Sequence, residues 1–429
     1  MPLPCGCRST APLDGEPSTC PVATWAVSGG MWLTGHAEGP PLAVDVDVMG
    51  FARRWLSRIA GNDGAGVDGT ATALFGRAAL AGLSRHGRSS ANGSCRLFET
   101  VDGWLAVNLA RPSDVDAVAA IVEQPPGHDP WEALVDAGRN RRAADLADRA
   151  QLLGVPAARM PARTCGTEPL HSTRLGPSSP PSSAPLVVDL SSMWAGPLCA
   201  RLLGRHVGAR VIKVEATSRP DGGRAGDPTF FDWLHGGHAS VAIDLTLDEG
   251  VHHLRTLVEQ ADVVLESSRP RALLQLGIDA GEIIARSPGM TWVSITGYGR
   301  TGDAANRVAF GDDAAVAGGL VARDAGGHPV FLGDAIADPL TGIVAASAAA
   351  ESIRSGGGRL LDVAMQQVSA HAVASSGLSP GPTDVTDDGD GWVVRHGNLM
   401  ARVQRPPRPH PTQSAEALGA STASVLGST

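Results

Sequence analysis

The chain has 429 residues, which is long for one compact core and predicts two structural units. It contains 35 Lys and Arg against 44 Asp and Glu, and the formal net charge of −9 argues against a general binder of nucleic acid or of anionic membranes. The sequence has no CxxC pair, no Cys–His spacing suited to zinc, no leader-like start and no run of 18 apolar residues. We therefore expect a cytoplasmic protein without a metal site.

The part before residue 160 predicts a disordered start, residues 1–23, and a small α+β domain, residues 24–160. "SCRLFETVDGWLAVNLA" (94–110) predicts a hairpin that turns at Asp102 and Gly103, and helical stretches follow it. Before the hairpin, "VMGFARRWLSRIAG" predicts a helix with three apolar residues on one face: Phe51, Trp55 and Ile59.

Residues 161–185 are rich in Pro and Ser and lack apolar periodicity, which predicts a linker. From 186 to 375, strand and helix signals alternate. One of the helices, "TLDEGVHHLRTLVEQA", starts with Thr246 and Glu249 spaced as a capping box. This alternation predicts an α/β fold with a Rossmann-like, open, mostly parallel sheet and helices on both faces, followed by a C-terminal tail over 376–429. The strand-like runs are "LVVDL", "RVIKVE", "SVAID", "DVVLE" and "MTWVSIT".

Two segments of the chain resemble each other. "AVSGGMWLTGHAEGPPLAVDVDV" (26–48) and "AVAGGLVARDAGGHPVFLGDAIAD" (315–338) both begin with AV-x-GG and place a proline before a β-like run. We interpret 24–160 as a decayed partial copy of the later segment and of what once followed it.

Two places in the second unit are candidates for chemistry. "SSMWAGPL" (191–198) joins the first strand to the first helix, where an open α/β sheet commonly binds its ligand, although a plain turn fits equally well. In "GDAIADPLTG" (333–342), Asp338 and Pro339 fit the N-cap and first position of a helix. Capping and catalysis are compatible, because the positive end of a helix favours an ionised, nucleophilic carboxylate.

The sequence motifs of common dinucleotide-binding proteins, NTPases and hydrolases do not support any of these functions for this chain. "GAGVDG" (64–69) matches GxGxxG, but a helix precedes it where a dinucleotide site requires a strand. GxxxxGK[ST], HExxH and GxSxG do not occur.

Six stretches resemble, in order and spacing, the family III CoA-transferases, which include formyl-CoA transferase, carnitine CoA-transferase and the α-methylacyl-CoA racemases. They are "VVDLSSMWAGPLCARLLGRHVGARVIKVE", "HASVAIDLTLDEG", "ADVVLESSRPRALLQLGI", "WVSITGYGRTG", "GDAIADPLTG" and "GGGRLLDVAM". The stretch from "NGSCRLFETVDGWLAVNLA" to "AQLLGVPAARMP" resembles the small domain of the family, and "RPPRPHPTQSAEALGASTASVL" its C-terminal tail. The resemblance implies a catalytic core at 186–375 and a small domain moved to the front.

The resemblance places Asp338 on the catalytic aspartate of the family. That carboxylate attacks an acyl-CoA thioester to give a mixed anhydride, and the released CoA then forms an aspartyl-CoA thioester. An acceptor acid reverses these steps and leaves as the new thioester. The implied partners are an acyl-CoA, a carboxylic acid and, since family members are typically interlocked dimers, a second copy of the chain.

The resemblance also implies contacts with CoA in three loops. Arg269, together with Arg224 and Arg271, is a candidate for the CoA phosphates, because an acidic chain needs local positive charge there. The loop contacts are Met193, Trp194, Ala195, Ile243, Asp244, Leu245, Thr246, Ser267, Ser268 and Arg269.

Two alternatives to a CoA-transferase remain open. The racemases use a His in a "GHD"-like element, where this chain reads "AFGDDAAV" with Phe310 or Gly311 at the position of the His, so transferase is favoured. A non-catalytic CoA-binding or assembly protein would fit the altered order of the domains and the loosely matching CoA loops. We expect "SSANGSC" (89–95) to lie over Asp338.

Overall fold

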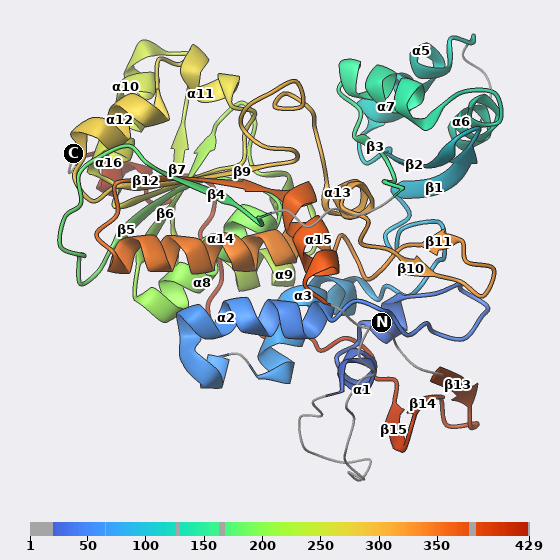
Figure 1. The fold of residues 1–429 in the computed structure, drawn as a ribbon. Coiled ribbons are helices and arrows are strands. Elements are labelled where there is room, and N and C mark those ends of the chain that lie inside the picture. Colours follow the sequence, from blue (N-terminus) through green and yellow to red (C-terminus); the bar gives the residue numbers. More distant parts are fainter. Residues whose placement is uncertain (1–19, 65, 126–128, 163–167, 377–382, 428–429) are drawn as a thin grey trace.

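The structure is a computed structural model of the chain, and it describes residues 20–64, 66–125, 129–162, 168–376 and 383–427 (Figure 1). The disordered start that we expected at 1–23 lies almost wholly outside these residues. From Cys20 onward the chain is described, and α1 (Pro21–Val27) follows at once.

A seven-stranded sheet forms the centre of the molecule, with the strand order β4-β12-β9-β8-β5-β6-β7. Six strands run parallel and β4 is antiparallel to β12, so the predicted mostly parallel α/β sheet is confirmed. The strands are β4 (His171–Arg174), β5 (Leu186–Leu190), β6 (Arg210–Ala216), β7 (Ala239–Ile243), β8 (Val263–Glu266), β9 (Thr291–Thr296) and β12 (Arg359–Ala364).

Helices cover both faces of this sheet, because neighbouring residues of a strand point to opposite sides. Val187 lies in the apolar core on one face and Val188 in the core on the other. The first face is covered by α8 (Ala195–Val207) and α14 (Ala337–Arg354), with α9 (Pro228–His235) and α15 (Met365–Ala374) beside them. The second face carries α10 (Asp248–Gln260), α11 (Arg271–Gln275) and α12 (Ala280–Arg286).

The N-terminal helices form a further layer beneath α14 and α8 (Figure 1). Phe51 and Leu56 of α2 (Val48–Gly64) and Leu74 of α3 (Val67–Ala81) belong to the same apolar core as α8 and α14. Trp55 and Ile59 pack against this core, so the predicted apolar face of α2 is confirmed. This part of the chain therefore packs directly against the central sheet unit.

The rest of the first half forms a separate α+β unit (Figure 1). Thr100 pairs with Gly103, so the predicted hairpin is present and turns at Val101 and Asp102. The strands are β1 (Cys95–Thr100), β2 (Gly103–Asn108) and β3 (Ala157–Arg159), and the helices are α4 (Pro112–Asp116), α5 (Val118–Val122), α6 (Pro130–Gly138) and α7 (Ala143–Leu152).

The two similar AV-x-GG segments occupy corresponding places in the fold. The first begins in the last turn of α1, which packs against the antiparallel sheet β13-β14-β15, and the second begins in the last turn of α13 (Gly311–Ala317), which packs against β2 and β3. Each segment leads to a long helix, α2 or α14, and these two helices pack against each other. The sheet strands are β13 (Thr383–Asp387), β14 (Trp392–His396) and β15 (Leu399–Arg402).

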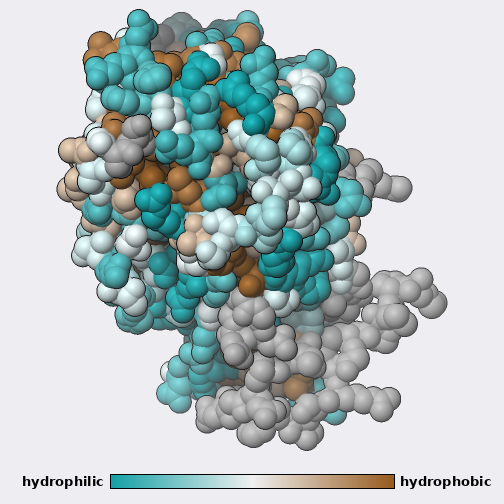
Figure 2. Space-filling model, turned by 90° about the vertical axis from the view of Figure 1, so that its left-hand side faces the viewer, coloured by the Kyte–Doolittle hydropathy of each residue, from teal (hydrophilic) through white to brown (hydrophobic). Residues whose placement is uncertain are grey.

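Short elements complete the described structure. They are η1 (Met31–Leu33), η2 (Gly222–Ala225), β10 (Ala322–Arg323), β11 (Pro329–Val330) and α16 (Thr422–Leu426). Within the described ranges, no helix combines the length and the apolar character needed to span a bilayer. On the face shown in Figure 2, hydrophilic residues cover most of the surface and hydrophobic residues form patches between them.

The predicted linker at 161–185 needs one correction. The Pro/Ser-rich segment 161–185 contains β4, whose four residues are all exposed; an edge strand without a buried face has no apolar alternation to reveal it. The domain boundaries drawn around this segment stay predictions.

Candidate active site

Asp338 lies in the first turn of α14 and is partly exposed. The helix begins at Ala337 with Ile336 as its N-cap, so Asp338 is not the cap that the Asp-Pro pair predicted. The reason is the tight turn just before it. Ala335 adopts a left-handed φ of 43°, and its carbonyl accepts a hydrogen bond of 2.9 Å from the Asp338 N–H, which starts the helix early.

Burial controls the charge of Asp338. It raises the pKa of this carboxyl from 3.8 to about 7, although the charge of Arg77 and a hydrogen bond from the Gly311 N–H both act in the opposite direction. The nearby Asp334 raises the pKa further. We expected the helix terminus to hold Asp338 ionised; instead, loss of solvent outweighs that effect, and the carboxyl titrates near neutral pH.

Gly311, at the start of α13, lies directly against Asp338. A Cβ added at Gly311 would come within 2.5 Å of Asp338 Oδ2 and 2.2 Å of the Ala335 carbonyl oxygen. No side chain fits here without a shift of the backbone. This is one of the two positions, with Phe310, at which the racemase alternative would need its His.

Two further buried carboxyl groups follow Gly311 on α13. Asp312 accepts a 2.9 Å hydrogen bond from Ala335 N–H, and burial raises its pKa to about 7. Asp313 accepts hydrogen bonds from Phe310 N–H (3.0 Å) and from Asn108 Nδ2 (3.4 Å), and burial raises its pKa to about 8. Since Asn108 ends β2, the α+β unit of the first half contacts the candidate site through this pair.

The sequence analysis missed Asp312, Asp313, Asn108 and Arg77. The two aspartates could have been found, because they lie within "AFGDDAAV", directly after the two positions at which the racemases would carry their His. Arg77 had no local signal: it lies on α3, and its partner Asp334 is 257 residues away in the chain.

The first and third predicted CoA loops lie next to each other at the carboxyl ends of β5 and β8. The Ser192 N–H donates to Ser267 Oγ at 3.2 Å and joins them. Met193 is 42% exposed in a left-handed conformation, with φ 71°, whereas Trp194 and Ala195 are buried. Strained non-glycine backbone often marks functional sites, and both Met193 and Ala335 border this one.

The second predicted loop lies further along the sheet, after β7, which is separated from β5 by β6. Ile243 is buried at the end of β7, and Asp244 Oδ1 accepts hydrogen bonds from the backbone N–H (2.9 Å) and the hydroxyl (2.6 Å) of Thr246. The expected Thr246–Glu249 capping box is therefore wrong: Asp244 takes the Thr246 hydroxyl, and α10 begins at Asp248 with Leu247 as its N-cap.

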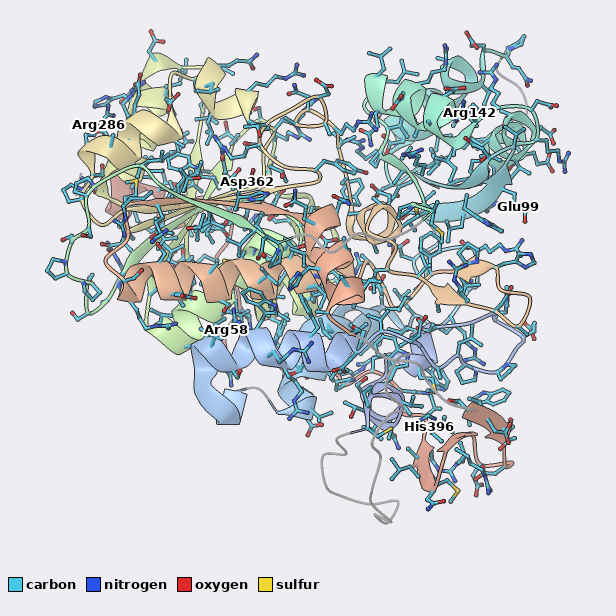
Figure 3. All side chains as sticks on the ribbon, viewed as in Figure 1. Arg58, Glu99, Arg142, Arg286, Asp362 and His396 are labelled. Atoms are coloured by element: carbon cyan, nitrogen blue, oxygen red, sulfur yellow. The ribbon has the colours of Figure 1, made fainter. Side chains whose placement is uncertain are left out.

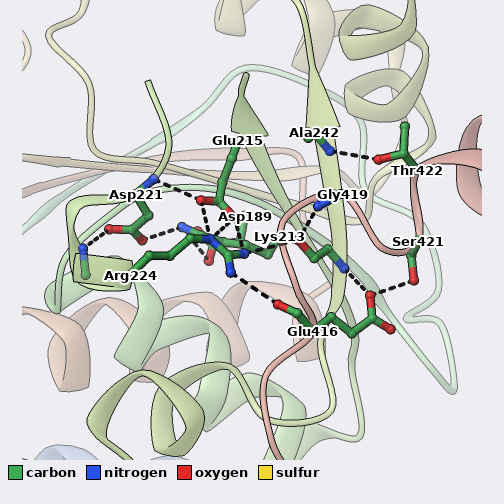
Figure 4. Close-up of polar contacts among 12 residues, drawn as sticks. Asp189, Lys213, Glu215, Asp221, Arg224, Ala242, Glu416, Gly419, Ser421 and Thr422 are labelled. Atoms are coloured by element: carbon green, nitrogen blue, oxygen red, sulfur yellow. Dashed lines mark hydrogen bonds and ion pairs between the residues drawn. The ribbon is translucent and has the colours of Figure 1, made fainter. Parts of the chain in front are cut away.

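The three candidate arginines differ in their surroundings. Arg269 and Arg271 are exposed, and neither pairs with an acidic side chain of the described chain. Arg224, in contrast, binds Glu215 with Nε at 2.9 Å and Nη2 at 2.6 Å (Figure 4). Its guanidinium already binds this buried partner, which makes Arg224 the least suited of the three to a CoA phosphate, and that contact stays a prediction.

A buried charge cluster contacts the Met193 loop through Asp221, and Figure 4 shows Asp221 with Lys213 and Asp189. Lys213, the only lysine of the chain, is 2% exposed and lies 2.9 Å from Asp221 Oδ2 and 3.9 Å from Asp189 Oδ2. Its Nζ also donates to the Ser191 carbonyl, and Asp221 Oδ1 accepts from the Met193 N–H at 2.9 Å. Burial opposes the charge on Lys213, but the two aspartates outweigh burial and raise its pKa.

The described residues contain no group of three or more His, Cys, Asp or Glu side chains arranged to hold a metal ion.

Comparison with known proteins shows which family the chain resembles. Residues 185–390 match the model of a family described as CoA-transferase family III. This segment, just under half of the chain, is similar to that family. The matched segment contains the central sheet from β5 onward, both adjacent CoA loops and Asp338.

Curated members of family III are similar over part of their length. A succinate–glutarate CoA-transferase of Agrobacterium fabrum is 31% identical over 47% of this chain and 54% of its own. A succinyl-CoA–D-citramalate CoA-transferase of Chloroflexus aurantiacus is 31% identical over 42% and 48%, and a human succinyl-CoA:glutarate CoA-transferase is 27% identical over 50% and 51%. The chain thus spans about half the length of the curated relatives it matches.

Solved structures give a similar extent of match. A hypothetical protein of Mycobacterium tuberculosis is 28% identical over 51% of this chain and 65% of its own, with a TM-score of 0.45. A CaiB/BaiF family protein of Brucella suis is 28% identical over 51% and 66%, with a TM-score of 0.44.

Proposed function

We propose that this protein is a family III acyl-CoA:carboxylate CoA-transferase with Asp338 as its nucleophile. The observation that carries the proposal is the setting of Asp338. Its carboxyl is partly exposed, receives a hydrogen bond from the Gly311 N–H, and lies beside the positive charge of Arg77. A carboxyl group that titrates near pH 7 supplies a large ionised fraction at neutral pH while it remains in an environment that excludes much of the water.

The proposed reaction proceeds through two covalent states of Asp338. An oxygen of its carboxylate bonds to the acyl carbon, the carbon–sulfur bond breaks, and the CoA thiolate leaves with the electron pair. The thiolate then attacks the Asp338 carbonyl carbon, which releases the donor acid and leaves an aspartyl-CoA thioester. The acceptor carboxylate reverses both steps, so the charges and protons of donor and acceptor balance.

We place CoA across the carboxyl ends of β5 and β8, in agreement with the usual position of ligands in open α/β sheets. Met193 is exposed there, and the adjacent Ser192 and Ser267 loops share a hydrogen bond. Arg269 and Arg271 are the cations available for CoA phosphates. Succinyl-CoA is our first candidate donor, because the named relatives transfer CoA from or to succinate.

The alternatives are less well supported. Racemisation would need a second base beside Asp338, and Gly311 leaves no room for one at its position. A non-catalytic CoA-binding or assembly protein would not require a partly exposed carboxyl titrating near neutral pH. A cytoplasmic homodimer stays a prediction from the sequence and the resemblance.

Intact-protein mass spectrometry tests the proposal. Wild type and Asp338→Asn are incubated with succinyl-CoA and a panel of other acyl-CoAs, with and without hydroxylamine. We expect a hydroxylamine-sensitive CoA adduct on the wild type alone, lost again on addition of succinate, glutarate, malate or citramalate if one of these is the acceptor. CoA binding by both proteins without any adduct would contradict the proposal and favour the binding protein.

A further inference from the structure

Arg77 reaches from α3 to the loop that precedes α14 and binds a buried aspartate. Its Nε lies 2.8 Å from Asp334 Oδ2 and its Nη2 2.6 Å from Asp334 Oδ1, a bidentate pair. Asp334 has no exposed surface, and Arg77 is 27% exposed. Bidentate pairing fixes the plane of a guanidinium as well as its position.

A second contact fixes the same guanidinium from another direction. Its carbon lies 4.8 Å from the centre of the Trp194 ring, in the geometry of a cation–π interaction. Trp194 is buried at the end of the loop that follows β5. Arg77 therefore connects the predicted CoA loop to the turn before Asp338, and its side chain has little freedom to turn away.

The charges that face Asp338 come from three parts of the fold. Arg77 on α3 is positive, whereas Asp334 in the preceding turn and Asp312 on α13 are acidic. The electrostatic influence of Arg77 extends to all three carboxyl groups, Asp312, Asp334 and Asp338. Without this cation, an ionised Asp338 would lie among acidic neighbours, and only the hydrogen bond from the Gly311 N–H would stabilise its negative charge.

We propose that Arg77 is a positioning residue for CoA transfer: held by Asp334 and Trp194, it maintains the carboxylate form of Asp338 at neutral pH. This inference rests on the proposed function, because the carboxylate form matters only if Asp338 attacks a thioester. The protonated acid is a poor nucleophile, so the rate of the first step follows the ionised fraction. The first half of the chain thereby takes part in the chemistry of the second.

Three variants separate this role from a purely structural one. Arg77→Gln removes the charge, Arg77→Lys keeps it without the bidentate geometry, and Arg77→Gln with Asp334→Asn removes both charges so that no unpaired carboxylate remains buried. Arg58→Gln is the matched control. Arg58 also stacks on a tryptophan, 4.2 Å from the Trp55 ring centre, but it lies on α2 (Figure 3) and is not among the charges that act on Asp312 or Asp338.

The first measurement is the rate of CoA-adduct formation across about pH 5.5 to 9. For Arg77→Gln we expect a loss of roughly fivefold or more at pH 7 that is largely recovered near pH 9, because loss of a close opposite charge raises a carboxyl pKa by about one unit or more. Arg77→Lys and the double variant should shift less, and Arg58→Gln should follow the wild type. A loss by the same factor at every pH would mean a structural role and would overturn the inference.

The second measurement does not depend on activity. Carbon-13 NMR of aspartate carboxyl groups, with the Asp338 signal assigned through Asp338→Asn, follows the titration of Asp338 directly. We expect its midpoint to move to higher pH in Arg77→Gln; an unchanged midpoint would overturn the inference. If the wild type forms no adduct, the proposed function fails, and the NMR titration still decides whether Arg77 controls the ionisation of Asp338.

Discussion

Replacement of Lys213 by Met should strongly destabilise the fold, because it leaves two buried carboxylates without their cation. Methionine matches the apolar stem of lysine, so the main change is the loss of the ammonium group 2.9 Å from Asp221 and 3.9 Å from Asp189. Removal of one partner from a buried ion pair costs about 3–5 kcal/mol. The loss should be smaller at acidic pH, where Asp189, whose pKa is already raised by burial, can take up a proton.

Urea unfolding followed by fluorescence and circular dichroism measures this difference. The chain has a single lysine, so amine labelling with mass spectrometry gives a second, local readout. In the folded wild type, Lys213 should be labelled only as the cluster around it opens. In urea, the Lys213 label should appear together with the global transition.

Arg286→Gln is the control for this experiment, because the Arg286–Glu259 pair is 49% and 40% exposed. Exposed pairs contribute about 0–1 kcal/mol. A loss below about 1 kcal/mol for Lys213→Met would refute the reasoning, since it would mean that water or protonation compensates the two carboxylates. Rapid labelling of Lys213 in the folded wild type would refute its burial.

Two further changes test the acidic cluster. Gly311→Ala should lower the rate of adduct formation by at least tenfold, because its Cβ would meet Asp338 Oδ2 at 2.5 Å and displace the carboxyl group; activity close to wild type would show that the backbone yields easily. Burial raises the pKa of Asp313 to about 8, so the folded protein holds a proton that the unfolded chain releases, and this contribution to stability is lost as the pH rises through about 8. Asp313→Asn should therefore flatten the fall in unfolding free energy between about pH 6 and 8, measured by urea titration at each pH; an unchanged slope would contradict the assignment.

Much of the central sheet could be predicted because its strands are buried on both faces. Val187 and Val188 face different helical layers, so the sequence shows a continuous apolar run rather than an alternation. The exposed strand β4 has no such run and was assigned to a linker. A buried strand can be predicted because its apolar residues form a pattern, and β4 has no buried residues to form one.

The candidate site was only partly predictable. The resemblance drew attention to Asp338, but its charge state depends on burial and on Arg77, and both come from long-range packing. Arg224 illustrates the same limit. The need for local positive charge in an acidic chain made it a candidate for a phosphate contact, whereas the fold places Glu215 within 2.6 Å of its guanidinium. Local sequence reports which groups are available, and tertiary structure decides which partners they find.

The C-terminal segment closes the open edge of the central sheet. Beside β7, Glu416 Oε2 accepts from the Ser240 N–H at 2.7 Å and Thr422 Oγ1 from the Ala242 N–H at 3.0 Å, while the Ser421 N–H donates to the Ser240 carbonyl (Figure 4). Side chains and one turn thus occupy positions where another strand could add. An unprotected edge strand is a template for aggregation. We therefore expect that removal of the C-terminal segment from Glu416 onward lowers solubility even if the active site is left intact.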